Sequence, residues 1–246
     1  MDTDRLARAA AAIQSARRVV AFTGAGISVE SGIPPFRGAD GLWSKYDPTV
    51  LDIRYFSAHP AGAWQVIKAI FYDYFGQARP NAAHIVLAQM EAAGMLGRVI
   101  TQNIDNLHQA AGSRTVTEYH GTSHRLTCLD CGKTVPYTPQ MFKKMPPRCS
   151  VCGGILKPDF VFFGEGIPLA AQRESLAETH AADVWLVIGT TGEVYPASLI
   201  PHEAKQNGAT IIEVNVAPSA YTPRLTDIFL QGKATAVMSA LWQLAG

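Results

Sequence analysis

Two pairs of closely spaced cysteines constrain the fold of this chain more than any other sequence feature. Cys128 and Cys131 form one C-x-x-C unit, Cys149 and Cys152 form another after 17 intervening residues, and the chain has only these four cysteines. Each unit presents two thiolates from one turn, and four thiolates complete a tetrahedral zinc site that leaves no position for a catalytic water. We therefore predict a structural zinc ion; the alternative is four buried thiols or a redox pair.

The rest of the chain has an α/β pattern. Helical periodicity at 2–17, 61–75, 82–93 and 169–180 alternates with short, nearly uniformly apolar runs at 18–23, 98–101, 184–189 and 210–215. Strands that are covered by helices on both faces have such apolar runs, whereas half-solvated antiparallel strands alternate. The pattern predicts an α/β fold, a Rossmann-like parallel sheet with helices on both faces, together with a small zinc-binding subdomain.

A length of 246 residues accommodates one sizeable domain with a smaller insertion but not two full-sized domains. Residues 124–156 hold all four cysteines and four prolines and show little hydrophobic periodicity. We assign 1–123 and 157–246 to the Rossmann-like domain, 124–156 to the inserted zinc-binding subdomain, and residues around 30–80 to a helical lid or insert.

Composition excludes several classes of protein. Apolar residues make up 48% and charged residues 17%, which excludes global disorder, and the net charge of +1 demands no polyanionic partner. No apolar run approaches the roughly 20 residues of a membrane span, and the N-terminal stretch does not resemble a signal peptide. We expect a cytoplasmic protein with no membrane partner. Few basic residues lie near the two C-x-x-C units, which we call knuckles, so we expect no specific nucleic-acid partner.

A glycine-rich turn follows the first predicted strand, in the segment Gly24-Ala25-Gly26-Ile27-Ser28. Glycines at such a turn let backbone amides approach a pyrophosphate at a helix N-terminus. The third glycine of the usual G-x-G-x-x-G pattern is replaced by Val29. On this turn alone, a dinucleotide site and a purely structural strand-to-helix turn both remain open.

Further blocks accompany this turn in a fixed order. They are SGIPPFRG at 31–38, TQNIDNLHQAAG at 101–112, EYHG at 118–121, PDFVFFGE at 158–165 and GTT at 189–191. Together with the turn and the knuckles, they resemble the sirtuin family, of bacterial or archaeal type, over nearly the whole chain. The resemblance implies an NAD-dependent protein-lysine deacetylase, which consumes NAD, transfers the acyl group to ADP-ribose and releases nicotinamide. Its partners would be acylated lysines in proteins or peptides.

The resemblance also implies roles for particular residues. His120 matches the general base that removes a proton from a ribose hydroxyl, and Asn103 is the second catalytic candidate. The remaining histidines default to surface or core positions, with a structural hydrogen bond expected for His108. The implied NAD-binding residues are Gly24, Ala25, Gly26, Ser28, Phe36, Arg37, Gln102, Asn103, Ile104, Asp105, Gly189, Thr190, Thr191 and Asn215. The segment that would pair with an acyl-lysine peptide by strand addition comprises Val161, Phe162, Phe163, Gly164 and Glu165.

The acyl preference follows from two further positions. Family members that prefer acidic acyl groups carry a tyrosine and an arginine, three residues apart, where alignment on His59-Pro60 places Ile67 and Ile70. We therefore expect a neutral acyl group. The chain departs from the family at Pro35, where an acidic residue is usual. The alternatives to a deacetylase are a mono-ADP-ribosyltransferase and a catalytically weak NAD- or zinc-binding module.

Overall fold

A parallel sheet forms the centre of the larger part of the molecule. The computed structural model describes residues 2–36 and 41–246. Within these residues, six parallel strands stand in the order β3-β2-β1-β7-β8-β9. The strands are β1 (Val19–Thr23), β2 (Leu96–Thr101), β3 (Val116–Glu118), β7 (Val184–Ile188), β8 (Thr210–Asn215) and β9 (Ile228–Gln231). The strand order reverses at β1, as it does in doubly wound folds.

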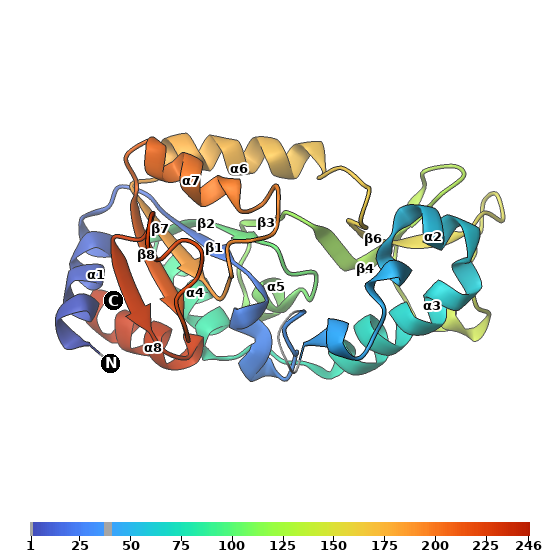
Figure 1. Ribbon diagram of the computed structural model, residues 1–246, viewed down its shortest axis with the longest axis horizontal. Helices are drawn as coiled ribbons and strands as arrows, with labels where there is room; N and C mark the ends of the chain where they lie inside the picture. The colour runs from blue at the N-terminus through green and yellow to red at the C-terminus, as the bar shows by residue number, and fades with distance from the viewer. Residues whose placement is uncertain (1, 37–40) are drawn as a thin grey trace.

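Helices cover both faces of this sheet (Figure 1). One face carries α1 (Thr3–Ser15), α4 (Ala82–Ala92) and α8 (Ala234–Ala245), and the other carries α6 (Leu169–Ala181) and α7 (Leu199–Gln206). All of β1 is buried. Its consecutive residues Ala21 and Phe22 belong to the hydrophobic cores on opposite faces of the sheet. This arrangement confirms the predicted parallel sheet, because only strands covered on both sides bury every side chain.

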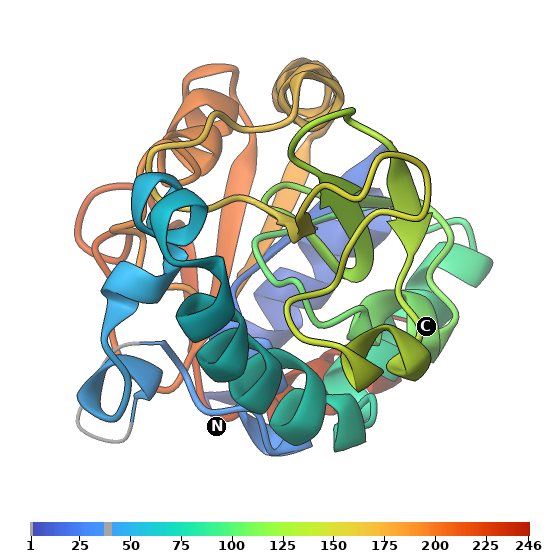
Figure 2. The same ribbon diagram turned by 90° about the vertical axis from the view of Figure 1, so that its right-hand side faces the viewer.

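A smaller part lies at the other end of the molecule and faces the viewer in Figure 2. Its antiparallel sheet consists of β5 (Thr134–Pro136), β4 (Gly121–Cys128) and β6 (Leu156–Phe160). The helices α2 (Ile53–Ala58) and α3 (Pro60–Lys68) pack beside it, and the indole nitrogen of Trp64 donates to the carbonyl of Leu156 at 2.8 Å. The predicted helical insert and the cysteine segment therefore share one core.

Several predicted boundaries differ from those of the structure. β4 begins at Gly121 and β6 continues to Phe160, and pairing of these two residues extends the small sheet beyond the predicted limits of 124–156. The helix predicted at 61–75 is α-helical only to Lys68 and continues as a π-helical turn over Ala69–Tyr74. Short 3₁₀ helices cover 25–31, 42–44, 48–51, 75–77 and 139–143, and α5 spans Leu107–Ala111. No helix in the described ranges has the length and apolar character that crossing a membrane demands.

Candidate active site and metal centre

The carboxyl ends of β1 and β2 bring polar side chains together at one edge of the parallel sheet. Thr23 and Thr101 end these strands as register partners, and the Thr23 hydroxyl donates to the Thr101 hydroxyl at 2.9 Å. Ligand sites of α/β sheets lie beyond the carboxyl ends of the strands, next to the point where the strand order reverses. The residues that follow β1 and β2 are therefore candidates for a ligand site.

The glycine turn packs tightly against the end of β7. The amide of Gly24 donates to the carbonyl of Ile188 at 3.0 Å, and that of Gly26 donates to the carbonyl of Gly189 at 2.8 Å. A Cβ atom on Gly26 would lie 2.6 Å from the Cα of Gly189, so no larger residue fits without displacing backbone. Both glycine amides are therefore engaged by carbonyls at the end of β7 and in the residue after it, and the turn continues as a 3₁₀ helix.

Asn103 and Asp105 are held beneath this turn by Ser28. The Asn103 amide nitrogen donates to the Gly24 carbonyl at 3.1 Å and to the Ser28 hydroxyl at 3.2 Å. The Ser28 hydroxyl in turn donates to Asp105 Oδ2 at 2.7 Å, and the Leu107 amide donates to Oδ1 at 3.0 Å. Burial raises the pKa of Asp105 despite these hydrogen bonds. The result is an amide and a carboxyl group in fixed positions.

Gln102, Thr190 and Asn215 connect the carboxyl ends of β2, β7 and β8. The side-chain amide of Gln102 donates to the Thr190 hydroxyl at 3.2 Å. The amide of Asn215, at the end of β8, donates to the Thr190 carbonyl at 3.0 Å. Gly189 has a φ of +64°, which permits the sharp turn after β7, and Thr191 is exposed beside it. Gln102, Thr190 and Asn215 thus lie at the same end of the sheet as Asn103.

His120 is half-buried in the turn between β3 and β4, and one of its ring nitrogens already has a hydrogen-bond partner. Its Nδ1 lies 3.1 Å from the Gln102 carbonyl oxygen. A carbonyl can only accept, so Nδ1 carries a proton and a neutral ring keeps its lone pair on Nε2. Burial lowers the pKa of His120, and the Gln102 carbonyl partly opposes this by raising it. The ring is therefore neutral at neutral pH, as a general base must be.

Two further histidines, His84 and His108, support the same end of the sheet from behind. His84 Nε2 lies 3.4 Å from the Ser28 hydroxyl, His108 Nε2 lies 2.9 Å from the Thr23 hydroxyl, and the two rings are 4.9 Å apart. Both residues are at most 1% exposed. Their core placement agrees with the sequence expectation, but the link from His84 to Ser28 was not predicted. The only local signal is the spacing from Asn81, which forms a capping box with His84 at the start of α4.

The Val161–Glu165 segment is fixed by hydrogen bonds within the chain. The Val161 amide donates to the His120 carbonyl at 2.9 Å. The Phe163 amide donates to the Leu51 carbonyl at 2.8 Å, and its own carbonyl accepts from the Ile53 amide at 3.0 Å. Strand addition at Phe163 itself would therefore displace the chain's own pairing. The Phe163 side chain is nevertheless 53% exposed and available for contact with a ligand.

The remaining predicted positions are dispersed. The half-buried ring of Phe36 packs 5.5 Å from that of Trp43, while Arg37 lies outside the described residues. Ile67 and Ile70 are 0% and 1% exposed in the core of the small part. The structure therefore places both isoleucines among apolar side chains and not at an open surface. Other predicted residues near the turn are half-buried Ala25 and buried Ile104.

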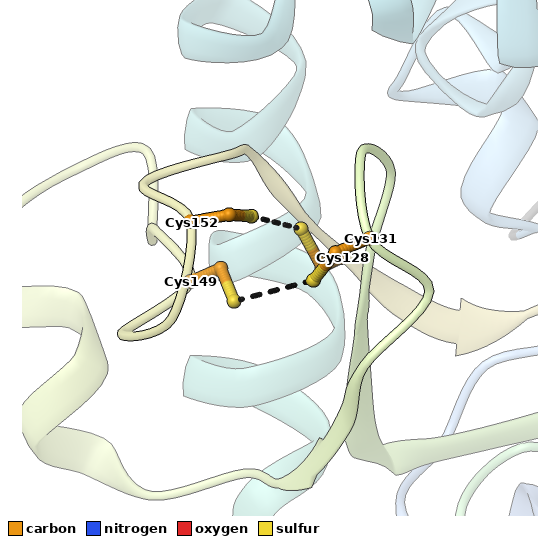
Figure 3. Close-up of side chains that lie close together, drawn as sticks. All are labelled: Cys128, Cys131, Cys149 and Cys152. Atoms are coloured by element: carbon orange, nitrogen blue, oxygen red, sulfur yellow. Dashed lines mark hydrogen bonds between the residues drawn. The ribbon is translucent and has the colours of Figure 1, made fainter.

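The four cysteines form a compact cluster with the dimensions of a zinc site. All four sulfur atoms lie within 4.8 Å of one another, with separations of 3.4 Å for Cys128–Cys152 and 3.8 Å for Cys131–Cys149. Figure 3 shows the side chains of both knuckles turned toward each other. Tetrahedral Zn–S bonds of about 2.3 Å place sulfurs about 3.8 Å apart. The cluster can therefore hold zinc as a closed, structural site.

Comparisons with known proteins agree with this geometry. The model of the Sir2 family matches residues 24–196. "NAD-dependent protein deacylase 2" of Pyrobaculum aerophilum is 46% identical, covering 93% of this chain and 91% of its own. A solved Sir2 homologue bound to NAD has a TM-score of 0.88 at 38% identity, covering 100% of this chain and 94% of its own. A Sir2 structure with a p53 peptide and NAD has a TM-score of 0.87 at 33% identity, with 95% of each chain covered.

Proposed function

The chain belongs to the Sir2 family, and from this membership we infer that it is an NAD-dependent protein-lysine deacylase. It consumes NAD as a co-substrate, releases nicotinamide and transfers the acyl group of a modified lysine to ADP-ribose. Its substrates are acylated lysines in peptides or proteins. The observation that carries this function is the convergence of Asn103, Asp105 and the neutral imidazole of His120 at one sheet edge.

We propose that His120 is the general base of the reaction. Its Nδ1 proton is held by the Gln102 carbonyl, which leaves Nε2 to accept a proton from a ribose hydroxyl. A general base of this kind contributes roughly 10²–10⁴-fold to a rate. The lowered pKa of His120 keeps the ring unprotonated at neutral pH, so no proton has to leave it before the reaction begins.

We propose that the residues after β2 hold the nicotinamide half of NAD. Asn103 and Gln102 lie where they can contact the nicotinamide ribose, and Ile104 and Asp105 can enclose the carboxamide. An amide and a carboxyl group that are fixed from behind by Ser28 suit such a ligand, because they need no reordering when it binds. Bound NAD supplies the electrophilic ribose and the nicotinamide leaving group, and these side chains orient that ribose and exclude water.

We propose that the ADP half of NAD binds where the turn after β1 packs against the turn after β7. Exposed Thr191 and half-buried Ala25 are available at this turn, whereas the amides of Gly24 and Gly26 shape it. Asn215 is our candidate for the adenosine ribose, together with the Thr190 region that it braces. Phe36 and Arg37 remain the candidate lid. These assignments remain predictions that follow from the family resemblance and from the placement of the described residues.

The acyl specificity is a separate proposal. Ile67 and Ile70 supply no cation, so a succinyl or malonyl carboxylate would be buried without a partner, at a cost of several kcal/mol. We expect kcat/KM for an acetyl-lysine peptide to exceed that for the succinyl-lysine peptide by at least roughly tenfold, which requires only about 1.4 kcal/mol. Comparable rates on both peptides would mean that the acyl pocket lies elsewhere or that another cation reaches it.

Mass spectrometry of products tests the function directly. The protein is mixed with NAD and an acetyl-lysine peptide, and we expect the deacetylated peptide, nicotinamide and acetylated ADP-ribose. Omission of NAD is the control and should abolish the mass change. ADP-ribose attached to protein, with the acetyl group retained on the peptide, would instead identify a mono-ADP-ribosyltransferase. Absence of all these products would leave a binding module.

A further inference from the structure

The ammonium group of Lys157 lies inside the small part of the molecule, where charged side chains are rare. Lys157 is 6% exposed, and its Nζ donates to the carbonyls of Pro158 and Phe160, both at 2.8 Å. It also forms an ion pair with Glu165 Oε2 at 3.0 Å. Three acceptors match the three N–H donors of a lysine. The group thus has the full set of partners that a buried charge requires.

All of these partners lie where β6 continues into the Val161–Glu165 segment. Two are carbonyls of β6, and the third is the side chain at the far end of the segment. Glu165 Oε2 also accepts the Phe162 amide at 2.8 Å, and the ammonium lies 4.2 Å from the centre of the Phe162 ring. One positive charge therefore ties the beginning and the end of the segment to the strand from which it leaves.

The same junction supports the main chain of His120. The Val161 amide donates to the His120 carbonyl, and Gly121, which pairs with Phe160 of β6, follows directly. Gly121 has a φ of +75°, and a Cβ atom there would overlap the carbonyl oxygen of Asp159. The segment and the candidate base thus share one backbone contact. The candidate NAD residues after β1, β7 and β8 belong to other elements.

We propose that Lys157 is a positioning residue, whose ammonium holds the Val161–Glu165 segment in the conformation that receives the acyl-lysine peptide. This inference rests on the proposed function, since it assumes that the peptide reaches this segment. Glu165 balances the charge of Lys157. The pair therefore fixes the conformation of the segment and adds little electrostatic potential to the site. Lys157 touches no reacting atom and acts through the segment alone.

Lys157→Met tests the proposal, because methionine keeps an apolar stem of similar length and removes the ammonium. We expect KM for an acetyl-lysine peptide to rise roughly tenfold, as for the loss of a charged hydrogen bond, with a smaller change in kcat. The Kd for NAD should stay within about twofold, because the NAD residues lie on other elements. Peptide affinity is measured by fluorescence anisotropy and NAD affinity by calorimetry. Lys157→Arg, which restores a cation with several donors, should recover part of the loss.

A double variant separates positioning from simple stability. Lys157→Met leaves the half-buried Glu165 without its cation, and Lys157→Met with Glu165→Gln removes the negative charge as well. We expect Tm to recover in the double variant while KM for the peptide stays raised. Recovery of both Tm and KM would overturn the proposal and make the pair purely structural. If the single variant does not fold, the double variant carries the same test.

A matched control and the wild-type protein complete the experiment. Lys205→Met, in α7, breaks the 2.5 Å ion pair with Asp227 and should leave KM for the peptide unchanged. A folded Lys157→Met variant with wild-type peptide KM would contradict the role of Lys157 alone. Wild-type protein that neither binds the peptide nor yields deacetylated product would contradict the proposed function instead.

Discussion

At the scale of single residues, His120 offers the sharpest test of the proposed chemistry. We predict that His120→Ala loses most deacylation, by roughly 10²-fold or more, and keeps NAD affinity within a few-fold, because the imidazole acts on a ribose proton and not on the phosphates. Calorimetry with NAD and product analysis by mass spectrometry measure the two properties. A variant with near wild-type turnover would remove His120 from the mechanism, and one that cannot bind NAD would make it structural.

The pH dependence of kcat/KM for the wild-type enzyme should also reflect the lowered pKa of His120. A base with a pKa below that of a free imidazole stays unprotonated to lower pH. The acid limb of kcat/KM should therefore have its midpoint below the ordinary histidine value of about 6.5. A midpoint above that value would indicate that another group, or a stabilised imidazolium, controls the reaction.

Adding one methyl group at Gly26 tests how closely the glycine turn packs against the residues after β7. A Cβ atom there would lie 2.6 Å from the Gly189 Cα and 2.8 Å from its carbonyl oxygen, both of them backbone atoms. We predict that Gly26→Ala lowers the free energy of unfolding by roughly 1–3 kcal/mol and weakens NAD binding, because the β1 and β7 turns must separate. Urea unfolding and calorimetry measure the two effects.

Gly62→Ala is the matched control for this substitution. Gly62 is exposed within α3, and a Cβ atom there meets nothing within 4 Å. Alanine should therefore stabilise the protein by roughly 0.5–1 kcal/mol, because it reduces the entropy that a helix loses on folding. If both alanine variants were equally stable, close packing at Gly26 would not be the reason for the glycine.

At the scale of elements, the knuckles and the small sheet depend on each other. Cys128, the last residue of β4, pairs with Leu156, the first residue of β6, so the metal site lies at one end of the small sheet. We predict about one zinc per chain, with Cys128→Ser unfolding the small sheet first and abolishing activity indirectly. Zinc binding in small modules contributes about 10–16 kcal/mol of apparent free energy to folding. The packing of a sheet this small cannot supply the same free energy without the metal.

Elemental analysis and circular dichroism check the zinc prediction. Freshly purified protein that has not met a chelator should contain zinc, and chelation should abolish peptide turnover while the helices of the parallel sheet persist. Ser150→Ala, a substitution between the two cysteines of the second knuckle, keeps all four ligands and should retain the metal. Metal-free protein with full activity would contradict a zinc site.

At the scale of the whole molecule, buried neutral histidines couple stability to pH. Burial lowers the pKa of His84 to about 4 and that of His108 well below its ordinary value. The unfolded chain binds a proton near pH 6.5, so it gains protons before the folded chain does as pH falls. We predict that the free energy of unfolding is highest above pH 6.5 and falls toward pH 4, by roughly 3 kcal/mol for His84 alone.

Thermal unfolding between pH 7 and pH 5 measures this effect, in a range above that in which carboxylates with depressed pKa values titrate. His84→Gln should flatten the dependence of Tm on pH. His180→Gln, at an exposed position on α6, is the control and should leave the slope unchanged. A wild-type Tm that is independent of pH over this range would mean that the buried pair does not remain neutral.

The sequence by itself determined the parallel sheet, the helices on its faces and the four-cysteine cluster. These depend on local information, namely apolar runs that need cover on both faces and ligand pairs within single turns. The polar residues that follow β1 and β2 were also found, because carboxyl ends of parallel strands share an edge.

Only the tertiary structure decided which atoms are free and which are already bonded. It engages the amides of Gly24 and Gly26 with the carbonyls of Ile188 and Gly189. It also pairs Phe163 with Leu51 and Ile53, and it buries Ile67 in a core. It also places Lys157 against Glu165, eight positions along the chain. These contacts join elements that are distant in the sequence or turn a strand back on itself, so periodicity and motif spacing contain no record of them. The protonation of His120 is decided in the same way, because a carbonyl from another strand's end selects the nitrogen that carries the proton.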